Sequence, residues 1–218
     1  MCCLFLAASS TVAIAQTNVV DLVNPIIGTN GMGHTFPGAC VPFGLVQLSP
    51  DTDTIPHNVD GKYQPRSYEY CAGYQHKDSS IVGFSHTHFS GTGHSDLGDI
   101  LIMPTTGTLK LNPGTATNPD GGYRSRFSHD TEISRPGYYE VMLADYGVKA
   151  QLTTTQRAGI HKYTYPTNSE NQRIILDMIH GIYNYDGKVL WTNIRVENDT
   201  LVTGYRITNG WARTNYTY

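Results

Sequence analysis

Short apolar runs that end in turn-forming residues recur along this chain, and they constrain its fold more than any other feature of the sequence. From Val41 onward such a run returns about every ten residues and is closed by Gly, Pro, Asn or Asp, a spacing typical of sandwiches and barrels. No segment of the sequence keeps the helical period of apolar residues. The strands predicted from this pattern are residues 81–84, 100–104, 138–143, 148–154, 161–165, 174–177, 189–196 and 201–207.

The predicted fold is therefore all-β, a large antiparallel β-sandwich whose successive strands pair as hairpins. Residues 197–199 provide the turn between the last two predicted strands. The composition agrees with this fold, since 15 Tyr, 22 Gly and 11 Pro favour strands broken by tight turns over long helices. With 39% hydrophobic residues in 218, the chain has enough apolar material for one core.

The balance of charge argues against a nucleic-acid-binding surface. Lys and Arg number 15 against 18 Asp and Glu, and the basic residues are scattered along the sequence. A nucleic-acid binder concentrates basic residues on one face. We therefore expect a neutral polar partner and no nucleic acid.

The first 15 residues are predicted to be a signal peptide. A short apolar run is followed by Ala13, Ile14 and Ala15, the small-x-small pattern that precedes a secretory cleavage point, although the usual positively charged start is missing. The apolar run is too short to cross a bilayer, so no transmembrane segment is expected. We predict a secreted or periplasmic protein whose residues 17–218 form one domain.

Cys40 and Cys71 are the cysteines that would remain after cleavage. An oxidising compartment would allow them to pair, but two cysteines make no disulfide framework. Buried thiols are the favoured interpretation, with a disulfide as the alternative.

A glycine-rich loop at residues 28–44 presents His34 and Thr35. Five glycines and two prolines in this stretch exclude a regular strand or helix. Phosphate binding by such a loop needs an adjoining helix N-terminus, which Pro37 and Pro42 block. The loop is expected either to place His34 and Thr35 at a domain edge or to be a structural turn.

The densest polar segment is residues 83–99, which contains His86, His88 and His94. In an extended segment His86 and His88 point to the same face, a geometry that some metal sites use, with Asp96 as a further ligand. The residue order of binuclear zinc hydrolases is absent. Three interpretations remain open: a zinc site, hydrogen bonds to a sugar or another domain, and a structural network.

Four arginines lie in or beside the predicted strands. For these residues we expect ion pairs at the surface or between strands. They are Arg124, Arg126, Arg157 and Arg206.

Two long segments are distinctive, and they are NPIIGTNGMGHTFPGACVPFGLVQLSP and GFSHTHFSGTGHSDLGDILIMP. Both resemble segments of the calcium-dependent, exo-acting α-mannosidases of glycoside hydrolase family 92. The similarity covers nearly all of the chain after the predicted signal peptide. The matching segments are residues 24–50, 83–104, 122–143, 152–166, 174–182 and 204–212.

The resemblance implies an N-terminal β-sandwich followed by an (α/α)-barrel, with the active site between them and a calcium ion that binds mannose. Inversion requires an acid and a base about 6.5 to 9.5 Å apart. In the family these carboxylates and the calcium ligands belong to the barrel. We therefore assign no catalytic and no metal-binding residue to this chain, and expect it to be truncated at its C-terminal end and inactive alone.

The resemblance also implies that the two signature loops face the barrel and help to bind mannose-containing glycans. His94 is the candidate for contact with the leaving-group sugar. The predicted substrate-binding residues are His34, Thr35, His86, His88, Thr92, Gly93, His94 and Asp96.

Two other functions are compatible with the residues alone. A stand-alone carbohydrate-binding module would need only an all-β fold and exposed aromatic rings, which Trp191 and Trp211 offer unless they are core. A zinc-dependent hydrolase would use His86, His88 and His94 as ligands.

Overall fold

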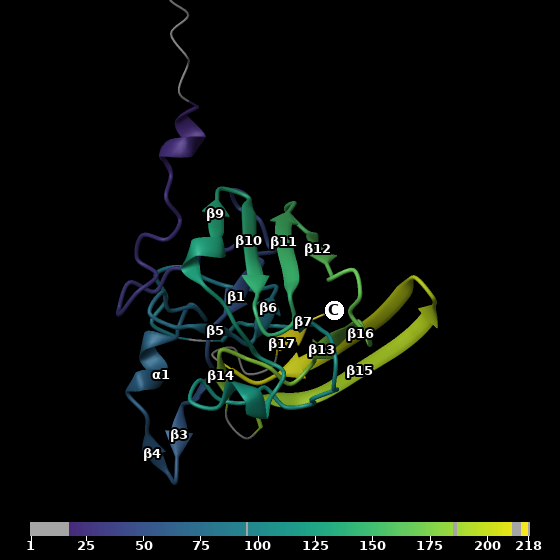
Figure 1. Cartoon of the computed structure of the whole chain (residues 1–218). Coiled ribbons are helices and arrows are strands. Elements are labelled where there is room, and N and C mark those ends of the chain that lie inside the picture. Colours follow the sequence, from purple (N-terminus) through teal and green to yellow (C-terminus); the bar gives the residue numbers. More distant parts are fainter. Residues whose placement is uncertain (1–17, 95, 185–186, 211–214, 218) are drawn as a thin grey trace, which may run out of the picture.

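The computed structural model describes residues 18–94, 96–184, 187–210 and 215–217, so the predicted signal peptide and Trp211 lie outside the described residues. The predicted all-β fold is confirmed, because nearly all regular structure consists of strands in mainly antiparallel sheets (Figure 1). The described helices are short, and none is long or apolar enough to cross a membrane. They are α1 (Arg66–Glu69) and the 3-10 helices η1 (Val19–Leu22), η2 (Pro119–Gly121) and η3 (His129–Thr131).

One four-stranded sheet shows the alternation expected of strands with one buried face. Its order is β12 (Gly159–Thr164), β11 (Val148–Thr154), β10 (Tyr138–Leu143) and β9 (Ile133–Arg135). Every second residue of β10 and of β11 is buried, as period-2 geometry requires. These two strands begin and end at the predicted residues.

The second four-stranded sheet has the order β1 (Ser49–Asp51), β6 (Gly83–Ser85), β7 (Leu101–Thr105) and β13 (Arg173–Asp177). Every residue of β1 and β6 is buried. Side chains of the two sheets form one hydrophobic core together with flanking segments. Its buried members are Leu48, Tyr74, Ile81, Val82, Phe84, Leu101, Met103, Tyr123, Phe127, Tyr139, Val141, Leu143, Val148, Ala150 and Leu152.

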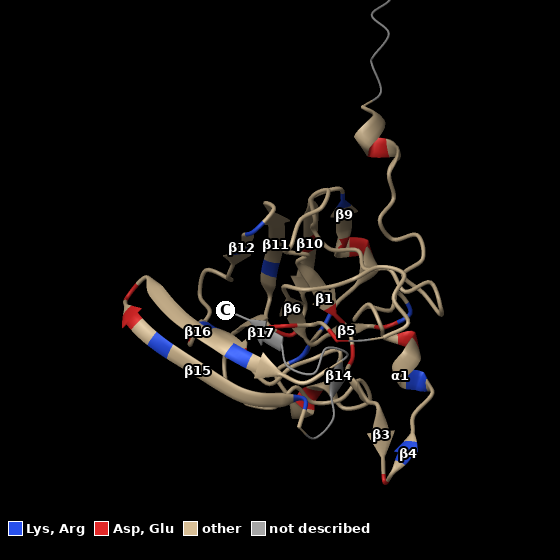
Figure 2. Ribbon diagram, turned by 180° about the vertical axis from the view of Figure 1, so that it is seen from behind, with Lys and Arg blue, Asp and Glu red and all other residues tan. Residues whose placement is uncertain are grey.

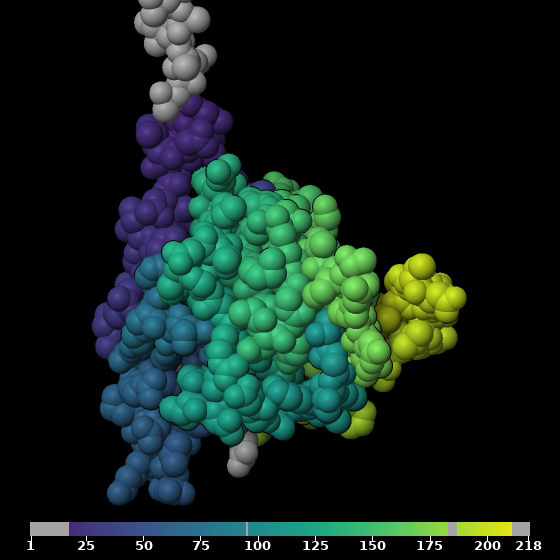
Figure 3. All heavy atoms as spheres, viewed as in Figure 1, coloured from purple at the N-terminus to yellow at the C-terminus, as the bar shows by residue number. Residues whose placement is uncertain are grey.

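A long hairpin of β15 (Val189–Asn198) and β16 (Leu201–Thr208) projects from this body, and β17 (Asn215–Thr217) extends its sheet. Figure 3 shows the hairpin standing out beside the core as a yellow protrusion. Almost every residue of β15 is exposed. The predicted antiparallel pairing of these two strands is confirmed.

Two-stranded sheets complete the fold, and they are β14 (Tyr183–Asn184) with β2 (Ile55–Pro56), β3 (Asn58–Val59) with β4 (Lys62–Tyr63), and β5 (Ser80–Ile81) with β8 (Ser125–Arg126). The predicted strand 81–84 is divided between β5 and β6. Figure 2 shows acidic and basic residues distributed over many elements.

The cysteine prediction is corrected in one respect. Cys71 is buried, as expected, but Cys40 is exposed, and the two thiols are not joined to each other. Cys40 lies in the glycine-rich loop, whose turns keep part of the backbone at the surface.

Candidate functional site

The polar loop between β6 and β7 turns first into the protein and then out to its surface. Just after β6, His86 is half-buried and His88 is buried. The tip of the loop, at Phe89, Ser90 and Gly91, is exposed. The Gly91 N–H donates to the carbonyl of His34 at 2.7 Å, which joins this loop to the glycine-rich one. The two predicted signature loops therefore lie against each other.

Four of the predicted substrate-binding residues line one surface hollow of about 550 Å³: Thr92, Gly93, His94 and Asp96, together with Phe89 and Leu97. Two hydrogen bonds shape this turn, because Thr92 Oγ1 accepts from the His94 N–H at 3.1 Å and donates to the His94 carbonyl at 2.9 Å. His94 Nδ1 lies 3.7 Å from Asp96 Oδ1. With 42% of its side chain exposed, His94 presents its ring to solvent.

His34 and Thr35 take different positions beside this hollow. His34 is buried with a positive φ of 50°, and its ring packs edge-on against Tyr68 with centroids 4.7 Å apart. A Cβ placed on Gly93 would lie 2.9 Å from Tyr68 Oη, so Tyr68 adjoins both signature loops. Thr35 Oγ1 donates to the carbonyl of Ile27 at 2.9 Å and stabilises its own loop.

His88 belongs to a buried ionic cluster with Asp51 and His180. Asp51 Oδ1 lies 2.9 Å from His88 Nε2, and Asp51 Oδ2 lies 2.7 Å from His180 Nε2. Burial opposes ionisation of Asp51, but the His88 and His180 rings outweigh it and hold the pKa of this carboxyl below its usual range. His88 Nδ1 also faces the Gln47 carbonyl at 2.7 Å. Both ring nitrogens of His88 therefore face oxygen atoms of other segments, the Gln47 carbonyl and the Asp51 carboxylate.

His86 belongs to a separate chain of hydrogen bonds. Its Nδ1 donates to the Ile100 carbonyl at 2.7 Å, which leaves Nε2 to accept from His161 Nε2 at 3.0 Å. His161 Nδ1 in turn accepts from Tyr163 Oη at 2.7 Å. Burial lowers the pKa of His86 and lowers that of His161 to about 3, in agreement with neutral rings.

These contacts do not assemble the zinc site considered from the sequence. Both ring nitrogens of His86 and of His88 have protein partners, and the two rings join different networks. The loop is not extended beyond β6, so the expected shared face does not form. His94 lies apart in the hollow.

Arg206 forms the predicted ion pair, but it does so inside the protein and not at its surface. Its side chain is fully buried, with Nη2 2.9 Å from Asp99 Oδ1 and Nη1 donating to the His180 carbonyl at 2.6 Å. Asp99 Oδ2 accepts from Thr87 Oγ1 at 2.7 Å. Burial, with a smaller contribution from Arg206, also lowers the pKa of the neighbouring Lys188 to about 8. Asp99, Lys188 and Arg206 thus form a group of neighbouring charged side chains beneath the polar loop.

Arg124 also forms its ion pair in the interior, whereas Arg126 forms its ion pairs at the surface. Arg124 is buried, and its Nη2 lies 3.0 Å from Asp53 Oδ1. Arg126 forms the expected surface ion pairs, each at 2.7 Å, with Asp120 and Asp145. The guanidinium of Arg124 is stable in the interior because oxygen atoms there accept its hydrogen bonds.

Sequence reasoning missed Asp51 and His180, and it did not predict the burial of Arg206. The available signal was a polar residue within or beside an apolar run: Asp51 ends a buried strand, and His180 follows the run that forms β13. Such a residue must find a partner in the fold, but the sequence does not say which one.

Comparison with known proteins places these observations in a family. The sequence profile of the glycosyl hydrolase family 92 N-terminal domain matches residues 22–218. A family GH92 α-mannosidase from Bacteroides thetaiotaomicron, solved with mannoimidazole, is 45% identical, with a TM-score of 0.81 over 91% of this chain and 24% of that chain. An inverting family GH92 mannosidase of the same organism is 25% identical, with a TM-score of 0.64 over 94% of this chain and 25% of its own.

A curated relative extends the similarity to a fungus. It is an uncharacterised secreted glycosidase from Arthroderma benhamiae, 29% identical over 170 residues, which are 74% of this chain and 19% of the relative. The chain therefore spans a quarter or less of the length of the proteins it resembles. Because the family profile covers residues 22–218, nearly the whole chain, we conclude that the chain is an N-terminal domain of glycoside hydrolase family 92.

Proposed function

We propose that the complete protein is a secreted or periplasmic α-mannosidase that removes terminal mannose from glycans, and that this chain forms one wall of its substrate pocket. The support comes from the structure of a mannoimidazole-bound α-mannosidase, which is 45% identical to this chain. The observation that carries the proposal is the hollow formed by Thr92, Gly93, His94 and Asp96 on a loop that carries the family resemblance.

The lining of the hollow suits an uncharged sugar. Thr92, His94 and Asp96 supply hydrogen-bonding groups, while Phe89 and Leu97 supply apolar surface. Sugar sites combine such surfaces with a few convergent polar groups. Phe89 is 61% exposed, so the apolar part is accessible to a ligand or to a second domain.

Calcium binding by the described hollow alone does not fit its donors. Calcium takes six to eight oxygen ligands. The hollow offers the Asp96 carboxylate and the Thr92 hydroxyl, and that hydroxyl is already hydrogen-bonded to the backbone of His94. In our proposal the calcium ligands and the two catalytic carboxylates come from a barrel domain outside this chain.

The projecting hairpin is the proposed contact surface for that barrel. Its exposed apolar side chains gather on β15 and the start of β16: Leu190, Trp191, Ile194, Val196, Leu201 and Val202. Large apolar side chains exposed in such number on one element are typical of an interaction surface. An exposed Trp191 also fits the alternative of a stand-alone carbohydrate-binding module.

The test compares the isolated chain with the complete protein. The complete protein should hydrolyse an aryl α-mannoside with inversion, lose activity on chelation and regain it with Ca²⁺, whereas the isolated chain should give no turnover. Chelator-sensitive turnover by the isolated chain would contradict the proposal that the catalytic carboxylates and calcium ligands lie outside it. Binding of mannan by the isolated chain, without turnover by the complete protein, would favour the binding module.

A further inference from the structure

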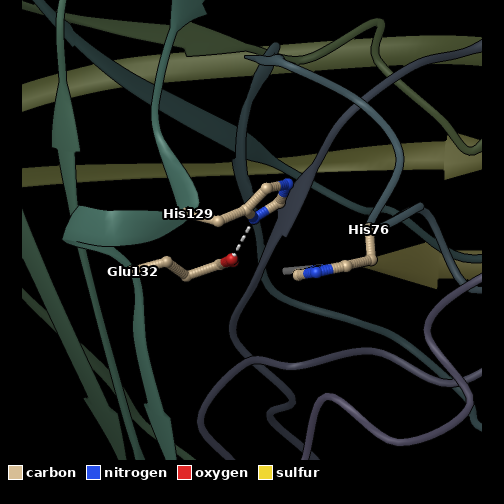
Figure 4. A group of neighbouring side chains, drawn as sticks. All are labelled: His76, His129 and Glu132. Carbon is tan, nitrogen blue, oxygen red and sulfur yellow. Dashed lines mark hydrogen bonds and ion pairs between the residues drawn. The ribbon is translucent and has the colours of Figure 1, made fainter.

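A second group of polar side chains lies away from the polar loop, at the end of the sheet that contains β9 and β10. His129 begins η3 and Glu132 follows its last residue, while His76 lies in the loop between α1 and β5. Figure 4 shows the three side chains converging from these two segments. One potential ligand atom of each lies within 4.8 Å of the other two.

Glu132 is held as a buried hydrogen-bond acceptor. Its side chain is 3% exposed, and its Oε1 accepts from Tyr74 Oη at 2.9 Å and from Tyr139 Oη at 2.6 Å. Tyr74 Oη also lies 3.0 Å from Oε2, the oxygen that faces His129 Nδ1, so the two tyrosines fix the carboxylate beside His129.

The imidazole of His129 is positioned on two sides. Its Nδ1 lies 2.7 Å from Glu132 Oε2, and its ring packs edge-on against Phe127 with centroids 5.0 Å apart. The His76 ring lies over it, with centroids 4.0 Å apart and planes tilted by 36°. The carboxylate and the His129 ring are therefore oriented before any ligand arrives.

His76 has an anchored backbone and a less constrained ring. Its N–H donates to the Thr29 carbonyl at 2.8 Å, but its Nδ1 lies 3.4 Å from Tyr74 Oη, at the long end of hydrogen bonding. Rotation of this ring can therefore bring a nitrogen toward the Glu132 carboxylate at little cost.

We propose that His76, His129 and Glu132 bind one divalent transition-metal ion of the zinc class. Two imidazoles and a carboxylate suit zinc and its neighbours, whereas calcium and magnesium prefer oxygen ligands. Tetrahedral zinc places its ligand atoms about 3.3 Å apart, so His129 Nδ1 and Glu132 Oε2 need to separate by roughly half an ångström. His129 is 36% exposed, which gives the metal an entry path and leaves a position for water.

The two tyrosines act as the second layer of this site. A ligating carboxylate is normally hydrogen-bonded through its remaining oxygen, which orients it toward the metal. Tyr74 and Tyr139 provide these bonds from the core. The bound ion would clamp η3 onto the loop at His76 and so stabilise the sandwich.

The test uses the purified chain, freed of metal with a chelator and titrated with Zn²⁺ alone. Calorimetry should find one equivalent, and zinc at a hundred times its Kd should raise the Tm by about 5 °C or more. His76→Ala and His129→Ala should each abolish most of this rise. His57→Ala is the matched control, because His57 also packs against an aromatic ring, that of Tyr63, but lies outside the cluster.

Circular dichroism of the metal-free variants separates loss of the site from loss of the fold. The two alanine variants should retain the wild-type spectrum. Mg²⁺ in place of Zn²⁺ should affect the Tm of the wild-type chain and of His76→Ala equally. Failure of the wild-type chain to bind zinc would overturn the proposal. An equivalent of zinc that persists in both alanine variants but is lost in His94→Ala would assign the metal to the polar loop instead.

Discussion

Asp51, His88 and His180 show, at the residue scale, how this protein keeps charge inside its core. The carboxylate contacts a ring nitrogen on each oxygen, and both side-chain partners come from other segments of the chain. Such a cluster stabilises the fold only when every member has its partner, because loss of one member leaves an uncompensated buried charge. His86 and His161 follow the opposite solution and remain neutral.

Asp51→Asn tests the ionic cluster. We expect the free energy of unfolding to fall by about 3 to 5 kcal/mol, because two buried rings lose their shared carboxylate. Urea denaturation measures the change. Asp120→Asn is the surface control and should leave stability near the wild-type value, since the Asp120 side chain is 75% exposed. Equal effects of the two substitutions would show that the cluster does not stabilise the fold.

Acid should weaken the fold through His161. Its folded-state pKa is about 3, below the value of about 6.5 expected when unfolded, so the unfolded state binds more protons between these pH values. The stability from the neutral ring is present above pH 6.5 and is lost as pH falls toward 3, by about 1 to 2 kcal/mol at pH 5. Urea denaturation at pH 7 and pH 5 measures the loss. His161→Asn should reduce the difference in the free energy of unfolding between pH 7 and pH 5. An unchanged difference in the variant would exclude the His161 ring as its source.

His94→Ala tests the surface hollow in the complete enzyme. Loss of one hydrogen bond to an uncharged sugar costs about 0.5 to 1.5 kcal/mol, so kcat/KM should fall roughly two- to twelve-fold. The Tm should hardly change, because 42% of the His94 side chain is exposed. A large drop in Tm with unchanged kinetics would mean that His94 has a structural role.

At the scale of elements, backbone geometry decides how the polar loop is folded. Gly98 and Gly91 both have positive φ, of 88° and 76°, yet their surroundings differ. A Cβ on Gly98 would lie 2.8 Å from Ile182 Cγ1 and 2.9 Å from Ile182 N, whereas nothing lies within 4 Å of a Cβ on Gly91. The loop thus passes close to Ile182 before it returns to β7, and the glycine at position 98 leaves room for this approach.

The two glycines form a matched pair for mutation. Gly91→Ala should cost only the strain of a positive φ, on the order of 1 kcal/mol. Gly98→Ala adds a clash with backbone and should cost about 2 kcal/mol or more beyond that. Differential scanning calorimetry of both variants measures the difference. Equal melting temperatures would show that the loop can move away from Ile182.

At the scale of the whole molecule, the chain combines a packed sandwich with an uncovered hairpin. β16 reaches the core only at its end, where Arg206 and Thr208 are buried, while β15 has an exposed apolar row. An exposed surface of this kind favours association.

The isolated chain is therefore expected to associate in solution. Trp191→Lys combined with Val196→Lys should shift it toward monomer, because both side chains are exposed, by 59% and 71%. Sedimentation velocity over a range of concentrations measures this, with Arg157→Lys as a control that preserves surface charge. A wild-type chain that stays monomeric and highly soluble would count against a missing partner for the hairpin.

The sequence by itself determined the all-β class and the strands of five or more residues, because alternation and turn residues act locally, whereas shorter strands such as β1 and β9 were not predicted. Residues 138–143 and 148–154 were predicted with their observed limits, since each buries every second side chain. The density of polar residues located the polar loop, and the resemblance to family 92 predicted its substrate-binding residues, four of which line one hollow. The roles of those residues toward a sugar stay predictions.

Only the tertiary structure decided which polar residues meet. Asp51 and His180 are 129 positions apart, and His86 and His161 are 75 apart, so no local pattern relates them. The burial of Arg206 likewise depends on Asp99 and on carbonyls supplied by another segment. Partner choice follows from how the sheets pack, because a buried charge is stable only where the fold brings its counterpart within hydrogen-bonding distance.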